Sequence, residues 1–254
     1  MRKIIFTVMA AAALLLAGCR SAGPSAARQA SQDPQASHTS QLSQAAGGAA
    51  SVNAATAPAV EGNPVKLVPV QAIDQNPELP TGCEVTSLTV ALNYYQIDID
   101  KCDIADNYIA KGPVGTVNFR KAFEGDPRDE NSFGCYAPVI VETANRILTE
   151  RGSDKRATEV SGMQLEALYS YLDRDVPVII WGTLDCEPGQ FTEVWNVDGE
   201  ELQWYSPEHC MVLAGYSVNS VWVADPMKGA VVRYDKEQFR TGYDALFKQA
   251  VVIE

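Results

Sequence analysis

The spacing of apolar residues changes its period part-way along the chain. In the first part, apolar positions recur every three to four residues, which is typical of helices that bury one face. Val85, Leu88 and Leu92 form such a series, and Thr81 with Glu84 provides a capping box that opens it. Further helices are predicted over residues 103–110, over residues 138–150, and from a second capping box at residues 161–164 through residue 172.

After about residue 176 the apolar residues form short runs that are typical of strands. An Asp-Gly pair at residues 198–199 indicates a hairpin turn. Strands are predicted over residues 65–70 at a sheet edge, then over 176–181, 209–216, 221–225, 230–234 and 250–253. Helices therefore come first and antiparallel strands second, which predicts an α+β fold with two halves packed face to face.

Residues 111–134 show neither period and are rich in glycine, proline and charge. Loops of this length are often functional. We predict that the loop from Gly112 to Gly134 walls a substrate cleft.

The N-terminus has the pattern of a targeting segment. Arg2 and Lys3 precede an apolar run of about 15 residues, which is shorter than the roughly 20 needed to cross a bilayer. The run ends in Leu-Ala-Gly-Cys at Cys19, which resembles the bacterial lipobox. That resemblance implies cleavage before Cys19 and lipidation of Cys19 on the outer side of a bacterial membrane, in the cell envelope. The alternative is an ordinary secretory signal that is cut elsewhere.

Composition divides the rest of the chain into a tether and a domain. Of the 45 residues from 20 to 64, 29 are Ala, Ser, Gln or Gly, which is too little apolar surface to form a core. We therefore predict a signal peptide over 1–18, a lipid-anchored disordered tether over 19–64, and one folded domain over 65–254. That domain holds 16 Lys and Arg against 30 Asp and Glu, a net charge of −14. A surface so acidic, without a basic run, argues against nucleic acid as a partner.

Cys83 is the first candidate for chemistry. The capping box makes it the second residue of a helix, where free backbone N–H groups and the helix dipole favour an anion. A thiol in that position can have a lowered pKa and act as a nucleophile. The alternatives are a small buried apolar residue or one half of a disulfide.

His209 and Asp225 are the next candidates. The chain has two histidines, and because His38 lies in the tether, His209 is the one available to the domain as a general base. If the strands 209–216 and 221–225 form a hairpin, a loop of three residues places His209 and Asp225 on the same face, whereas a loop of four does not. A carboxylate there would orient the imidazole. A structural histidine and an ordinary Asp-Pro turn are the alternatives.

Five segments together resemble one family. They are Pro80 to Leu88 with Leu92 to Tyr95, Phe133 to Val139, Pro177 to Trp181, Glu208 to Tyr216, and Val223 to Pro226. In this order they are similar to papain-like bacterial cysteine peptidases related to the double-glycine leader peptidases that process bacteriocins. The resemblance implies a papain-like fold, with Cys83 as nucleophile, His209 as base and then acid, and Asp225 as the orienting residue.

The chain departs from that pattern before the nucleophile. Papain-like enzymes place a glutamine about six residues before the cysteine, and Pro77 occupies that position here. Gln75 could supply the oxyanion-stabilising donor only if residues 78–80 loop out, and Asn76 is a rival. The Cys83 backbone N–H would be the other donor.

The remaining cysteines leave several possibilities open. Cys102, Cys135, Cys186 and Cys210 can form two disulfides in three connectivities, or none. No Cys-x-x-Cys pair is present, which argues against a zinc site, and we expect neither a metal nor a cofactor.

These observations lead to one main hypothesis about function. The chain is expected to be a membrane-anchored thiol hydrolase that cleaves extracytoplasmic peptides or peptide-like amides through an acyl-enzyme. An acyl transferase with the same residues and a non-catalytic peptide-binding lipoprotein are the alternatives.

Overall fold

The computed structural model describes residues 63–254. The predicted signal peptide, Cys19 and all but the last two residues of the predicted tether lie outside the described residues. Among the helices of residues 63–254, none combines the length and the apolar character that a membrane span requires.

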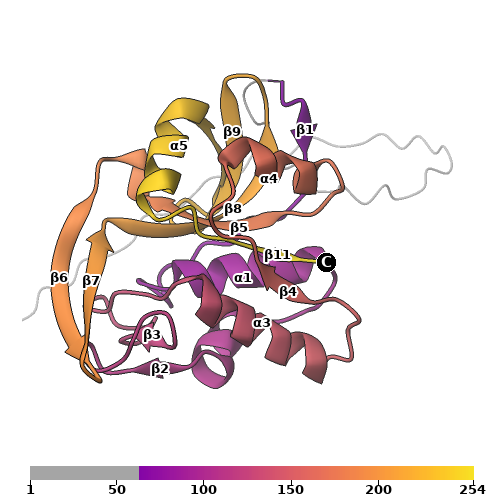
Figure 1. The fold of residues 1–254 in the computed structure, drawn as a ribbon. Helices are drawn as coiled ribbons and strands as arrows, with labels where there is room; N and C mark the ends of the chain where they lie inside the picture. Colours follow the sequence, from indigo (N-terminus) through magenta and orange to yellow (C-terminus); the bar gives the residue numbers. More distant parts are fainter. Residues whose placement is uncertain (1–62) are drawn as a thin grey trace, which may run out of the picture. The chain divides into compact units, whose positions relative to one another are not determined.

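A seven-stranded sheet forms the centre of the domain (Figure 1). Its strands run in the order β10-β9-β8-β5-β11-β4, and β1 pairs with one end of β8. All of these pairings are antiparallel. The strands are β1 (Lys66–Leu67), β4 (Ala157–Glu159), β5 (Val178–Thr183), β8 (Glu208–Tyr216), β9 (Ser220–Asp225), β10 (Ala230–Asp235) and β11 (Ala250–Ile253).

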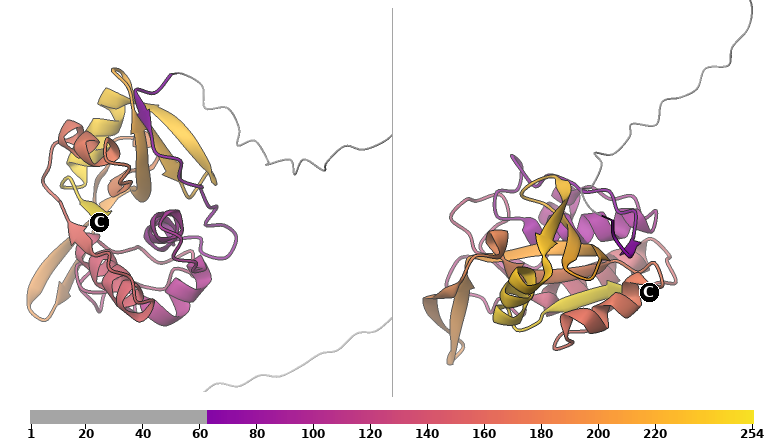
Figure 2. Two further views of the ribbon diagram at one scale, coloured as in Figure 1. Left: turned by 90° about the vertical axis from the view of Figure 1, so that its right-hand side faces the viewer. Right: turned by 90° about the horizontal axis from the view of Figure 1, so that it is seen from above.

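Helices cover both faces of this sheet. Figure 1 shows α1 (Cys83–Tyr94) and α3 (Ala137–Glu150) on one side, and α4 (Leu165–Leu172) and α5 (Lys236–Ala245) on the other. Figure 2 shows the same arrangement from two further directions. Because β5 and β8 are covered twice, their residues are almost all buried, which explains the continuous apolar run at 176–181. The order of helices and strands confirms the predicted α+β class.

Several local predictions are wrong. Where a helix was predicted over residues 103–110, a short helix α2 (Lys101–Asp103) continues as a π-helical turn over Ile104–Tyr108, so the bounds were wrong. The helix α5 and the strand β4 were not predicted, because α5 is mostly polar and β4 is only three residues long.

The predicted capping box of the first helix is also absent. Gly82 is the N-cap of α1, so Cys83 is the first helical residue and not the second. The hydroxyl of Thr81 donates to the carbonyl of Asp129 at 3.0 Å, which turns it away from the helix. The Thr81 side chain thus bonds to the backbone of residues 126–129 and does not cap α1.

The irregular segment between α2 and α3 packs against a long hairpin. The hairpin consists of β6 (Gln190–Val197) and β7 (Glu200–Ser206), which turn at the predicted Asp-Gly pair. The segment contains a small parallel pair, β2 (Lys111–Gly112) and β3 (Phe123–Glu124). Aromatic rings join the two, with centroids 4.7 to 6.5 Å apart among Phe119, Phe133, Tyr136, Trp195 and Trp204. The loop is therefore held in place from the hairpin side.

Candidate active site

Cys83 lies where α1 begins, and the chain before it turns tightly. Gly82 approaches Leu79 so closely that an added Cβ would lie 2.6 Å from the Leu79 Cβ atom. Only glycine fits at this position without a shift of the turn. Since Cys83 is the first residue of the helix, its N–H group has no acceptor within the helix.

The start of β8 provides the surface on which α1 begins. Strand β8 pairs with β9 only from Val212 onward, so one edge of its first residues is free of β9. The amide N of Cys210 donates from this edge to Cys83 Sγ at 3.4 Å. The Ser87 hydroxyl donates to the Cys210 carbonyl at 3.1 Å. The nucleophile candidate thus contacts the residue that directly follows His209.

His209 and Asp225 are brought together by the β8–β9 hairpin. His209 Nε2 lies 2.8 Å from Asp225 Oδ1, and both residues are buried. Three residues, 217–219, connect the strands, but the first pair is Tyr216 with Val221. Four residues therefore separate the paired positions, which would place the two side chains on opposite faces. A β-bulge between Leu213 and Gly215 shifts the register by one residue and restores a common face.

Asp225 is held as an anion by three donors. Besides the His209 ring, the Met227 amide donates to Oδ1 and the Tyr234 hydroxyl donates to Oδ2, each at 2.9 Å. Burial raises the pKa of Asp225, but the hydrogen bond and charge of His209, with those two donors, outweigh it and hold the pKa below its usual value. Asp225 therefore stays ionised and can orient the imidazole.

The thiol of Cys83 has a different partner from the one expected. Its Sγ donates to Glu84 Oε2 at 3.3 Å. Within residues 63–254, Sγ makes no hydrogen bond to the His209 ring. Burial, and then the nearby carboxyl groups of Glu208 and Glu84, raise the pKa of Cys83 well above its ordinary value. The expected lowering at the helix N-terminus is therefore outweighed, and Cys83 is a neutral thiol in this structure.

The buried Glu84 and the partly buried Glu208 form an acid cluster with Cys83 that the sequence did not indicate. One ligand-type atom from each of the three side chains lies within 4.8 Å of the others. Glu84 Oε1 accepts a hydrogen bond from the Cys135 amide at 2.6 Å, and Glu208 Oε1 is buried without a partner. Among the described residues, these three side chains are the group close enough together to bind a metal ion. The Cys83–Glu84 hydrogen bond already accounts for the short distance between those two side chains.

The two carboxyl groups of this cluster do not titrate normally. Burial raises the pKa of Glu84 to about 7, although its hydrogen bonds oppose the rise. Burial and the neighbouring Glu84 raise the pKa of Glu208 well above its usual value. At least one proton is therefore retained by the pair near neutral pH.

Gln75 lies beside the candidate site in a turn that includes residues 76–78. Its backbone N–H donates to the Pro226 carbonyl at 2.9 Å, and its carbonyl accepts from the buried Lys101 ammonium at 2.9 Å. The side-chain Nε2 donates to the carbonyl groups of Leu79 at 3.2 Å and Pro80 at 2.9 Å. An amide nitrogen has two hydrogens, so neither is left for an oxyanion in this arrangement. The Asn76 side chain is exposed and points to Met227. The oxyanion role of Gln75 stays a prediction.

A model of the Peptidase_C39 like family matches residues 67–251. The chain belongs to this family. It is a cysteine peptidase-like enzyme, and the resemblance drawn from the five sequence segments is confirmed.

Two similar proteins cover most of the domain. A crystal structure of a C39-like peptidase from Bacillus anthracis is 30% identical, with a TM-score of 0.66 over 76% of this chain and 98% of that chain. The uncharacterized protein YvpB of Bacillus subtilis is 27% identical over 186 residues, which are 70% of this chain and 71% of YvpB. The papain-like α+β fold inferred from the sequence is thereby confirmed. A double-glycine motif protease domain, solved with its leader peptide, matches with a TM-score of 0.42 at 14% identity, over 74% of this chain and 92% of that chain.

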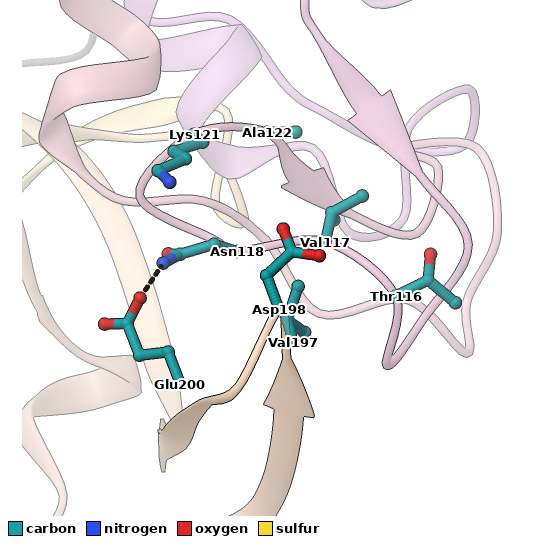
Figure 3. Close-up of a pocket in the computed structure, with 8 residues that line it drawn as sticks. All are labelled: Thr116, Val117, Asn118, Lys121, Ala122, Val197, Asp198 and Glu200. Carbon is teal, nitrogen blue, oxygen red and sulfur yellow. Dashed lines mark hydrogen bonds between the residues drawn. The ribbon is translucent and has the colours of Figure 1, made fainter.

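A hollow of about 360 Å³ lies between the irregular loop and the tip of the hairpin (Figure 3). There Asn118 of the loop donates to Glu200 of β7 at 3.0 Å. The lining of the hollow comes from residues 116–122 and 197–200 and does not include Cys83, His209 or Asp225. The loop therefore shapes a hollow, but one that is distinct from the nucleophile's immediate surroundings.

The five cysteines of residues 63–254 are all free thiols in this structure. Of the open connectivities, the structure thus corresponds to the one without disulfides. Cys83, Cys135, Cys186 and Cys210 are buried, and Cys102 is partly exposed.

Proposed function

We propose that this protein is a membrane-anchored, extracytoplasmic thiol hydrolase that cleaves peptide or peptide-like amide bonds through Cys83, His209 and Asp225. The observation that carries the proposal is the buried His209–Asp225 hydrogen bond of 2.8 Å, formed one residue away from the amide that contacts Cys83 Sγ. Membership of a cysteine peptidase-like family supports the reaction class.

The His209–Asp225 hydrogen bond supports one direction for the proton transfer. Because His209 Nε2 is bound to Asp225, the other ring nitrogen, Nδ1, is the one left to exchange a proton with the thiol. Cys83 would transfer its proton to Nδ1 as Sγ attacks the amide carbon, and the imidazolium would then protonate the leaving amine. Water, deprotonated by the same nitrogen, would release the acid and restore the thiol.

The oxyanion would form next to the start of α1. The N–H of Cys83 has no acceptor within the helix, so it can donate to the substrate oxygen. The thiol must first leave Glu84 Oε2, its partner in this structure, to reach His209. The resting site is therefore not yet arranged for attack.

Trapping the acyl-enzyme tests the reaction without knowledge of the natural substrate. We expect activated esters of short peptides to give one equivalent of acylated protein, with the added mass on the peptide that contains Cys83. His209→Ala should slow this acylation at least about a hundredfold, because the general base is lost. The partly exposed Cys102 offers a control, since Cys102→Ala should react at the normal rate. Equal acylation in His209→Ala and in the unaltered protein would refute the proposed mechanism.

The anchor is a separate part of the proposal and needs its own test. Cys19→Ala is expected to move the full-length protein from the membrane fraction to the soluble fraction, because the acyl chains would be lost. Metabolic labelling with a fatty acid should mark the unaltered protein and Cys102→Ala, but not Cys19→Ala. Retention of Cys19→Ala in the membrane would contradict the lipid anchor.

A further inference from the structure

The first residues of β8 present two kinds of proton acceptor on opposite faces of the sheet. Successive side chains of a strand alternate, so Glu208 and Cys210 point to one face and His209 to the other. The amide that contacts Cys83 Sγ belongs to the strand edge, in the plane between the two faces. The thiol therefore contacts the acid cluster, whereas the imidazole belongs to the opposite face of β8.

In this structure the thiol is bound to the acid cluster. Cys83 Sγ donates to Glu84 Oε2 at 3.3 Å, and the carboxyl groups of Glu84 and Glu208 lie within 4.8 Å of each other. Space around the cluster is tight, since a Cβ added at Gly134 would lie 2.3 Å from Glu84 Oε1 and 3.3 Å from Glu208 Oε2. Neither carboxyl group has an ion-pair partner within the part of the chain that the structure describes.

We propose that Glu84 and Glu208 form a proton-binding carboxyl pair that holds Cys83 as a neutral thiol in the resting enzyme, and that they are positioning residues for the nucleophile. The inference rests on the proposed function, because it concerns the same cysteine. The pair competes with His209 for the thiol. While a carboxylate oxygen accepts a hydrogen bond from the S–H group, transfer of the thiol proton to the imidazole is disfavoured.

Charge explains why this pair matters for the thiol. Two carboxyl groups this close, in a buried site, cannot both ionise without a large cost, so the pair keeps a proton. Any negative charge that it carries opposes formation of the thiolate nearby, in agreement with the raised pKa of Cys83. The titratable groups that surround the pair are Cys83 from α1, Cys135 and Tyr136 before α3, and Cys210 from β8. His209 belongs to the other face of β8, and Glu124 of β3 directs its carboxylate to the Gly115 amide.

The pH dependence of Cys83 alkylation tests this inference. The intact protein is treated with iodoacetamide at several pH values, and modification of the peptide that contains Cys83 is measured by mass spectrometry. Glu208→Gln keeps the shape of the side chain and removes its charge. We therefore expect the midpoint of the pH profile of Cys83 alkylation to fall by about one pH unit. Below the midpoint the rate should rise only about threefold, because a thiolate of lower pKa is also less nucleophilic.

Three further variants keep the experiment decisive. Glu84→Gln retains an oxygen that can accept the hydrogen bond from the Cys135 amide, and it should also lower the midpoint of the profile. Glu124→Gln is the matched control: it removes a buried carboxylate that accepts from the Gly115 amide, and it should leave the midpoint unchanged. Glu208→Asp, which restores the charge, should move the midpoint back toward that of the unaltered protein.

The outcomes separate this inference from the proposed function. An unchanged midpoint in both Glu84→Gln and Glu208→Gln, or an equal shift in Glu124→Gln, would overturn the role of the pair. If Cys83 still forms the acyl-enzyme in that case, the proposed hydrolase stands and only the pair is refuted. If no acyl-enzyme forms in any variant, the proposed function fails.

Discussion

Cys83→Ala is expected to abolish acyl-enzyme formation and to lower amide hydrolysis at least about a thousandfold. The thiol is the atom that bonds to the substrate, and neither His209 nor the helix N-terminus can replace it. The buried Cys83 side chain is small, so alanine should leave the fold intact. Hydrolysis is measured with a set of fluorogenic peptide amides on which the unaltered protein is active, and thermal unfolding verifies the fold.

Cys102→Ala provides the matched control for that experiment. Cys102 is a free thiol near the start of a different helix, and its loss should change hydrolysis by less than twofold. If Cys83→Ala retained most of the activity, the nucleophile would have to be another group, and the assignment of the site would be wrong.

Asp225→Asn is expected to lower the rate of acylation by about a hundredfold while the protein stays folded. The amide of asparagine is neutral, so it does not stabilise the imidazolium, and its NH₂ group can force the other imidazole tautomer. Stopped-flow acylation by activated peptide esters measures this loss, and it should be larger than any change in substrate binding. A loss below tenfold would show that Asp225 has no part in the proton transfer.

Tyr234→Phe tests how finely Asp225 must be held. The phenol donates to Oδ2, whereas His209 is bound to Oδ1, so phenylalanine removes one donor and leaves the pair with His209. We expect a loss of no more than about tenfold. An effect as large as that of Asp225→Asn would mean that Tyr234 itself takes part in the reaction.

The periodic segments were predictable because their signal is local. Regular apolar spacing identified α1, α3 and α4, and continuous apolar runs identified β5 and β8, since each pattern follows from burial of one or both faces. The order of Cys83, His209 and Asp225 along the chain, together with the five segments, was enough to identify the family. The polar helix α5 gave no such signal, because its buried side is narrow.

The relation between His209 and Asp225 shows where local reasoning stops. A loop of three residues was expected to place them on one face, and they do share a face. The first pair, however, is Tyr216 with Val221, so four residues separate the paired positions, and the bulge near Gly215 makes up the difference. Loop length and bulge offset each other, and only strand pairing reveals either of them.

By itself, the sequence determined the class of the fold, the family and the three residues on which the proposed chemistry depends. The tertiary structure decided what each side chain contacts. It turned Thr81 away from the helix that it was expected to cap, and it directed both hydrogens of the Gln75 amide to carbonyl groups. It also formed the hydrogen bond from the Cys83 thiol to Glu84 and placed Glu208, more than a hundred residues away, beside them. Periodicity records burial along one segment, whereas hydrogen bonds and pKa values depend on groups that meet only when distant segments pack together.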